Sequence, residues 1–413
     1  MENFTLLLKK YADFIVRVGV NPQPGQTLII NCCLEAAPLA RLCVRSAYEA
    51  GARDVLVNWS DNDVSRSRME LGSEEALTDF KSYQLRRYLD YAESEGGVCV
   101  LHLLADDPEV YAGLDGAKIS RVNAAQRKFM APWREYTMND RVQWSIAAMP
   151  SAPWAKKIFP ELDEAAAIEK LWQLIFDVCR VTGGDPVNEW KAHLDRLTGL
   201  KDKMNALDLE SVHFESGNGT DLTVGIADKA VWESAASVSE KGVVFLPNIP
   251  TEEVFTAPHK DKVNGIVYGT KPYVFNGQLI KGFHVTFKDG RVVEHGADEG
   301  AELLGRLLDT DEGARSIGEV ALVPASSPIN RSGALFYSTL FDENAACHIA
   351  FGASYPGTTE NGTRLTKDEL LARGMNQSAI HEDVMVGAED SHITGKCRDG
   401  RTVELFRDGV WVL

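Results

Sequence analysis

One stretch of the sequence, between residues 27 and 58, constrains the fold of this chain more than any other. Thr27 to Cys33 is a short apolar run typical of a strand, Ala37 to Ala50 has helical character and ends at a glycine, and Asp54 to Asn58 is again strand-like. A strand, a helix and a second strand in this order join two parallel strands. We therefore predict an open, mostly parallel α/β sheet in the first half.

The remainder of the first half fits the same architecture. Met1 to Gly19 carries apolar residues at helical spacing and predicts an amphipathic opening helix, whereas Gly97 to Leu104 and Val142 to Ala148 predict further strands. The residues after the first strand, Asn31 to Glu35, contain no glycine-rich turn of the kind that holds a dinucleotide phosphate. A nucleotide-binding α/β protein is therefore disfavoured.

A domain boundary is predicted between residues 184 and 185. A chain of 413 residues is long enough for two domains. After two glycines, Asp185 and Pro186 form a good helix start, with aspartate as the cap and proline at the first helical position. We expect an α/β domain over residues 1–184 and a second domain over residues 185–413.

The second half consists mostly of short strand-like segments. A hairpin is predicted from Gly282 to His295 around Asp289-Gly290, a dipeptide that accepts positive φ, and one helix is predicted from Ala297 to Leu308. This pattern indicates a mixed α+β C-terminal domain with much antiparallel sheet. The other expected strands are Leu209 to Glu215, Asp221 to Ile226, Gly242 to Leu246, Gly318 to Val323, His348 to Gly352 and His381 to Val386.

Composition excludes several classes of function. The net charge is −17, with 60 acidic against 43 basic residues, and this balance argues against binding to nucleic acid or to anionic membranes. We find neither an export signal nor about 18 successive apolar residues, the length that predicts a membrane span. The seven cysteines are scattered without a CxxC pair, which is typical of reduced thiols. We expect a cytoplasmic protein without nucleic-acid or membrane partners.

The triplet His381-Glu382-Asp383 is the first candidate for chemistry. On a strand, His381 and Asp383 project to the same face with Cα atoms roughly 6.6 Å apart, and Glu382 points to the other face. A carboxylate and an imidazole beside a buried strand are costly unless they are paired or bind a metal ion. Both a histidine–aspartate hydrogen bond and a metal site satisfy this requirement.

Three further polar residues lie in apolar surroundings. His348 opens a short apolar strand, and Tyr355 precedes a Pro-Gly turn that can direct its hydroxyl into a cleft. Glu319 lies inside an apolar strand, where an unpaired carboxylate is disfavoured, so its face meets either solvent or a cation. Taken singly, each residue also fits an ordinary structural role.

Glu252 and Glu253 follow a rigid segment with two prolines. Thr251 is a possible cap for a short helix that would place both glutamates in its first turn, where the helix dipole favours them. The sequence alone therefore offers a structural and a catalytic interpretation of these two residues.

Together, these residues supply three carboxylates, two imidazoles and one phenol from one domain. This set of donors suits two divalent ions about 3.5–4 Å apart, as in two-metal hydrolases. Oxygen ligands with imidazole suit zinc, cobalt, manganese or magnesium alike.

Four stretches of the sequence resemble the aminopeptidase T/aminopeptidase S family of metallopeptidases, and the opening of the chain also fits it. They are Asn248 to His259, Gly318 to Val323, His348 to Gly352 with Tyr355-Pro356, and His381 to Gly387. The resemblance implies a homodimeric metal-dependent aminopeptidase whose active sites face an enclosed cavity, so that its substrates are short peptides with a free amino terminus. It also implies two metal ions, and it prefers Glu253 to Glu252 in a ligand set of Glu253, Glu319, His348, Tyr355, His381 and Asp383.

In the mechanism that this implies, two divalent ions activate a water molecule and polarise the scissile carbonyl. Tyr355 is also a catalytic candidate, because its hydroxyl can stabilise the oxyanion. The alternatives are another two-metal amidohydrolase or phosphoesterase, and a non-catalytic metal- or peptide-binding protein. The motifs lack the basic cluster that would hold a phosphate, which disfavours a phosphoesterase.

Overall fold

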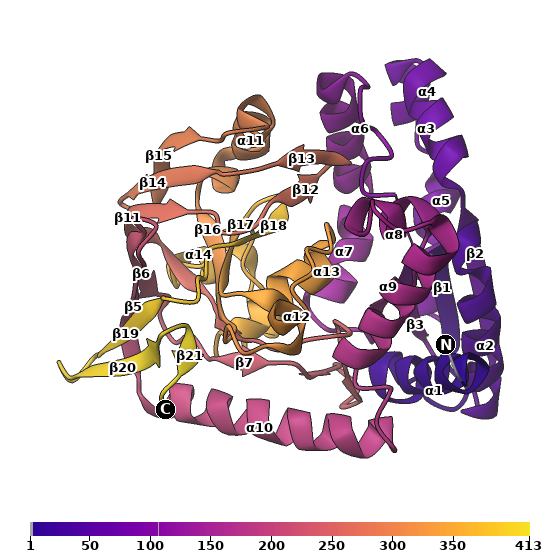
Figure 1. Ribbon diagram of the computed structural model, residues 1–413, viewed down its shortest axis with the longest axis horizontal. Helices are drawn as coiled ribbons and strands as arrows, with labels where there is room; N and C mark the ends of the chain where they lie inside the picture. The colour runs from indigo at the N-terminus through magenta and orange to yellow at the C-terminus, as the bar shows by residue number, and fades with distance from the viewer. Residues whose placement is uncertain (1–2, 106) are drawn as a thin grey trace. The chain divides into compact units, whose positions relative to one another are not determined.

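The computed structural model describes residues 3–105 and 107–413, and the chain divides into two compact units (Figure 1). Unit 1 comprises Met1–Leu194 and Ala235–Thr251, and unit 2 comprises Asp195–Ser234 and Glu252–Leu413. Helix α10 (Pro186–Ala206) contains the point at which unit 2 begins. The domain boundary predicted at residue 184 stays a prediction.

Unit 1 contains a four-stranded parallel sheet in the order β2-β1-β3-β4. The strands are β1 (Thr27–Cys33), β2 (Asp54–Ser60), β3 (Val98–Leu104) and β4 (Trp144–Ala148), close to the predicted ranges. The first crossover helix, α2 (Ala37–Glu49), also lies where the spacing predicted it. The prediction of an N-terminal α/β region with a parallel sheet is therefore confirmed.

Helices cover this sheet through apolar contacts. On one face, Ile29 and Val100 of the sheet pack against Leu89 and Trp133. The opening segment is not one regular helix, because α1 (Phe4–Phe14) passes into a π-helical segment, Ile15–Val20. The further helices of unit 1 are α3 (Asn62–Leu71), α4 (Glu74–Thr78), α5 (Ser82–Ala92), α6 (Gly116–Phe129), α7 (Ala131–Met138), α8 (Ala152–Ile158) and α9 (Glu164–Val178).

Unit 2 is rich in antiparallel sheet. Its larger sheet has eight strands in the order β15-β14-β11-β6-β5-β19-β20-β21 (Figure 1). The predicted hairpin is present, with Asp289 and Gly290 at φ 48° and 81° in the turn. The strands are β5 (Leu209–Glu215), β6 (Asp221–Ile226), β11 (Pro258–Tyr268), β14 (His284–Lys288), β15 (Arg291–Gly296), β19 (His392–Cys397), β20 (Thr402–Arg407) and β21 (Val410–Trp411).

The smaller sheet of unit 2 has five antiparallel strands in the order β18-β17-β16-β10-β7. These are β7 (Glu233–Ser234), β10 (Val254–Thr256), β16 (Ile317–Leu322), β17 (His348–Gly352) and β18 (His381–Met385). Phe351 of β17 stacks on Phe287 of β14, with ring centroids 6.3 Å apart, so the two sheets of unit 2 pack against each other. Because side chains alternate along a strand, His348 and Ala350 lie on the opposite face of β17 from Phe351.

Short segments complete unit 2. A hairpin joins β12 (Tyr273–Phe275) to β13 (Gln278–Ile280), and the helices are α11 (Ala301–Leu308), α12 (Pro328–Arg331), α13 (Thr339–Asp342) and α14 (Lys367–Ala372). The 3-10 segments of the chain are Leu34–Ala36, Glu312–Arg315, Glu343–Ala345, Pro356–Thr358 and Gly362–Arg364. No helix in residues 3–105 and 107–413 is both long and apolar enough to span a membrane.

One predicted strand is shorter than expected, and one possible helix is absent. The strand predicted over Gly242 to Leu246 is reduced to β9 (Val244–Phe245), which pairs with β8 (Ser237–Val238). The short helix that Thr251 was to cap is absent, and the strand β10 begins directly after Glu253. Val254 and Thr256 are buried and pair with Leu322 and Val320, so sheet formation prevails over the local capping preference.

Candidate metal centre

The five-stranded sheet brings together five of the six residues that the resemblance implied as ligands. Glu253 precedes β10, Glu319 lies in β16, His348 opens β17, and β18 supplies His381 and Asp383. The register aligns them, because Ala350 of β17 pairs with Glu319 on one side and with Asp383 on the other. Residues more than a hundred positions apart in sequence therefore share one face of a rigid sheet.

The side chains form two groups that share Glu319. In the first, Nε2 of His348 lies 3.1 Å from Oε2 of Glu253 and 3.6 Å from Oε1 of Glu319. In the second, Nε2 of His381 lies 3.4 Å from Oε2 of Glu319 and 3.6 Å from Oδ1 of Asp383. Within each group the possible ligand atoms lie within 4.8 Å of one another. The two oxygens of Glu319 thus face different groups.

Both imidazoles are oriented by main-chain carbonyls. Nδ1 of His348 donates to the carbonyl of Glu343 at 2.9 Å, and Nδ1 of His381 donates to the carbonyl of Ala353 at 2.7 Å. Because the proton is on Nδ1 in each ring, Nε2 is available to bind a metal ion, and its direction is fixed.

The buried position of Glu319 excludes the interpretation that its face meets solvent, since the residue is only 4% exposed. Burial disfavours its charge, but hydrogen bonds with His348 and His381 outweigh that effect and lower the pKa of Glu319 to about 2. Burial also works against protonation of His381, yet the charges of Asp383 and Glu319 raise its pKa to about 9. In the metal-free protein, protons on the imidazoles therefore balance part of the negative charge.

The remaining carboxylates are not fully balanced. Burial raises the pKa of Glu253 and that of Asp383 above their usual range, although both lie near histidines. Oδ1 of Asp383 is buried and accepts no hydrogen bond from any residue in the described part of the chain. A buried carboxylate oxygen without a donor is costly, and a cation is what satisfies it. The oxygen and imidazole donors thus fit divalent metal ions.

Glu343 is a further carboxylate near this centre, and the sequence analysis missed it. It lies in the 3-10 segment Glu343–Ala345, is 6% exposed, and interacts electrostatically with Asp383, Glu253, His348 and Glu319. Burial and these neighbouring negative charges raise its pKa well above the usual range. The available signal was the acidic pair Asp342-Glu343, whose second member lies five residues before His348.

Tyr355 also lies beside the centre. Its ring packs edge-on against His381, with centroids 4.5 Å apart, and also contacts Phe255. This contact places Tyr355 next to the second group of ligands. Its roles as a ligand and as a catalytic residue stay predictions.

Glu252 has different surroundings from Glu253. Its side chain is 1% exposed and lies 3.4 Å from the guanidinium of Arg196, and it belongs to neither group of candidate ligands. This arrangement agrees with the preference for Glu253 that the resemblance implied.

Comparison with known families assigns the chain to a family of metalloproteases. The thermophilic metalloprotease (M29) family matches residues 4–411. The chain belongs to this family. It is therefore a metalloprotease, a hydrolase of peptide bonds that uses a metal, and the resemblance found in the sequence is confirmed.

Relatives in this family match over their full length. Aminopeptidase 2 from Geobacillus stearothermophilus is 45% identical over 100% of this chain and 99% of the relative. Aminopeptidase T from Thermus aquaticus is 40% identical over 100% of both chains. The structure of wild-type AmpT from Thermus thermophilus superposes with a TM-score of 0.90, at 38% identity, over 99% of this chain and 100% of that one.

Proposed function

We propose that this metalloprotease is an aminopeptidase that removes amino-terminal residues from short peptides with the help of two divalent metal ions. The observation that carries this proposal is the pair of carboxylate–imidazole groups that share Glu319. A carboxylate with one oxygen directed to each group is suited to bridge two ions.

Each ion would have its own set of ligands. Glu253, Glu319 and His348 would hold one, and Glu319, His381 and Asp383 would hold the other, with Tyr355 next to the second. The donors fit zinc, cobalt, manganese or magnesium. When bound, such ions polarise a carbonyl and lower the pKa of water, and this is the chemistry that peptide hydrolysis needs.

The chain's own residues would position the substrate. The free amino group of a peptide would bind a metal ion or a carboxylate of the centre, and an acetylated terminus lacks this amino group. The main-chain carbonyl of Glu343 accepts a hydrogen bond from Nδ1 of His348 and so would help to orient this ligand. The hydroxyl of Tyr355 would donate a hydrogen bond to the carbonyl oxygen as negative charge develops on it.

On the resemblance alone, we extend the proposal to the location, oligomeric state and substrates of the enzyme. It would be a cytoplasmic homodimer whose substrates are short peptides. The net charge of −17 favours neither nucleic acid nor an anionic membrane as a partner.

The test is amino-acid release from a leucyl peptide with a free or an acetylated terminus. The protein would be treated with chelator and then resupplied with zinc, cobalt, manganese or magnesium. We expect cleavage of the free peptide only, lost on chelation and restored by metal. Equal cleavage of both peptides would instead indicate another amidohydrolase, and metal binding without cleavage would indicate a binding protein.

A further inference from the structure

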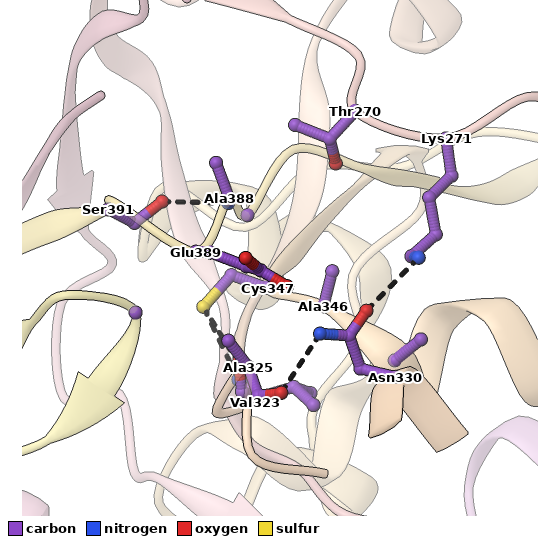
Figure 2. A pocket seen from close by; sticks show the side chains of 13 residues that line it. Thr270, Lys271, Val323, Ala325, Asn330, Ala346, Cys347, Ala388, Glu389 and Ser391 are labelled. Carbon is purple, nitrogen blue, oxygen red and sulfur yellow. Dashed lines mark hydrogen bonds between the residues drawn. The ribbon is translucent and has the colours of Figure 1, made fainter. Parts of the chain in front are cut away.

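Unit 2 contains a cavity of about 200 Å³ at the end of the smaller sheet where β16 and β18 finish and β17 begins (Figure 2). One wall is Ala345 to Cys347, which links Glu343 to His348. Val323 follows β16, Cys347 precedes β17 and Gly387 follows β18, so all three lie at the same end of this antiparallel sheet. The other walls come from the ends of the larger sheet, at Thr270, Ser391 and Gly409. The cavity thus lies where the two sheets meet.

Two opposite charges line this cavity. Within the described residues, the ammonium group of Lys271 donates one hydrogen bond, to the neutral amide oxygen of Asn330 at 3.2 Å (Figure 2). Across residues 3–105 and 107–413, neither Lys271 nor Glu389 forms a salt bridge. The charge of Lys271 does act through space on Asp342. Burial raises the pKa of Asp342 to about 7, and the positive charge of Lys271 offsets part of this rise. The cavity therefore offers a cation and an anion that the described chain leaves without direct ionic partners.

Two hydroxyl groups add to this polar lining. Oγ1 of Thr270 is buried and makes no hydrogen bond within the described residues, and in Figure 2 it points toward the middle of the labelled side chains. Oγ of Ser391 accepts a hydrogen bond from the amide of Ala388 at 2.8 Å, and none of the described residues accepts its proton. A buried hydroxyl without a partner is costly, so a bound polar group would stabilise this arrangement.

We propose that this cavity binds a free α-amino acid. Its carboxylate would interact with Lys271 and the Thr270 hydroxyl, and its ammonium group with Glu389. The volume is below the roughly 300–1,000 Å³ of sites for drug-sized ligands, so a peptide of several residues does not fit. The rest of the wall is made of small apolar residues, among them Val323, Ala325 and Ala346, which suit an aliphatic side chain.

The choice of ligand follows from the pair of charges. A simple anion would be attracted by Lys271 but repelled by Glu389. A simple cation would be attracted by Glu389 but repelled by Lys271. A zwitterion satisfies both. The proposal rests on the proposed function in one respect, because the aminopeptidase reaction would supply the amino acid. The binding of an amino acid can nevertheless be measured whether or not the protein cleaves peptides.

The experiment is calorimetric titration of L-leucine into the metal-loaded protein and four variants. Lys271→Met and Glu389→Gln each remove one charge of the cavity. Lys288→Met and Glu294→Gln are matched controls on exposed positions of β14 and β15. Binding in this cavity is measured as the heat that is lost in both cavity variants and retained in both controls. Heat from product binding at the metal ions would remain in all four variants. Circular dichroism checks that each variant is folded.

We expect the cavity variants to bind leucine at this site at least ten-fold more weakly, with kcat/KM for a leucyl peptide unchanged. N-acetyl-L-leucine lacks the ammonium group and L-leucinamide lacks the carboxylate, so neither should produce this heat. If Lys271→Met binds leucine as the parent does, the proposal is overturned. If N-acetyl-L-leucine binds through Lys271 as tightly as leucine, the cavity is a carboxylate site and the amino-acid assignment is wrong.

Discussion

The substitution Glu319→Gln tests whether one carboxylate connects two metal ions. Glutamine keeps the size of the side chain but removes the charge that both groups share, and an amide is a much weaker metal ligand than a carboxylate. In the parent protein, a free metal concentration of 100 times Kd stabilises the folded state by about 2.7 kcal/mol for one ion, and by about 5 kcal/mol for two.

These energies convert into a measurable shift in Tm. In a unit of roughly 150–250 residues, 1 kcal/mol changes Tm by about 2–4 °C, so metal should raise the Tm of unit 2 by about 10–20 °C. Changing groups around metal ligands costs roughly 10–100-fold in affinity. Losing the shared ligand should cost at least about 100-fold, which leaves about 0.4 kcal/mol for each ion. The shift in Glu319→Gln should then be only about 2–3 °C.

The assay is differential scanning calorimetry with and without chelator, combined with metal analysis of the dialysed protein. Comparing the two conditions within each variant cancels any effect of the substitution on folding itself. Glu252→Gln is the matched control, because this neighbouring buried glutamate lies beside Arg196 and outside both groups. If Glu319→Gln retains two ions and the full shift, Glu319 does not connect two metal ions.

Three other predictions concern Glu343, Tyr355 and His102. Glu343→Gln should weaken metal binding roughly 10-fold, because bound cations would favour the charged form of this buried carboxyl group, which glutamine cannot adopt. Metal titration would check this, and an unchanged affinity would count against an electrostatic role of Glu343. Tyr355→Phe should lower kcat with metal content unchanged if the hydroxyl acts on the oxyanion, and an equal loss of metal would make Tyr355 mainly a ligand. Burial lowers the pKa of His102 in β3 to about 4, whereas an unfolded histidine titrates near about 6.5. Its contribution to stability should therefore be complete above pH about 6.5 and fall by up to about 3 kcal/mol as the pH drops toward 4. NMR titration of the ring and urea unfolding of His102→Gln would check this, and a ring that titrates near 6.5 would contradict it.

The sequence predicts much of the fold because local patterns agree with tertiary structure in many places. The strand–helix–strand unit at Thr27 to Ser60 and the Asp289-Gly290 hairpin are visible in short windows. Thr251 to Glu253 shows the limit of such windows. A good local helix start is overridden when Val254 pairs with Leu322, a partner that no local pattern reveals.

Some residues of the candidate centre were predictable from local patterns, whereas their arrangement was not. An acid in an apolar strand identifies Glu319, and alternation places His381 with Asp383, at 3.6 Å as observed. The sharing of Glu319 between two groups depends on the register of β16 with β17, which residues far apart in the chain determine. Glu343 was missed because a three-residue 3-10 segment has no periodicity to mark it.

The central claim is that Glu319 lies between two divalent ions. Its most direct test is anomalous scattering from crystals of the protein prepared with cobalt or zinc. We predict two anomalous peaks about 3.5–4 Å apart, one beside Glu253 and His348 and the other beside His381 and Asp383. A single peak away from Glu319, or no peak at this sheet in protein that cleaves leucyl peptides, would contradict the claim.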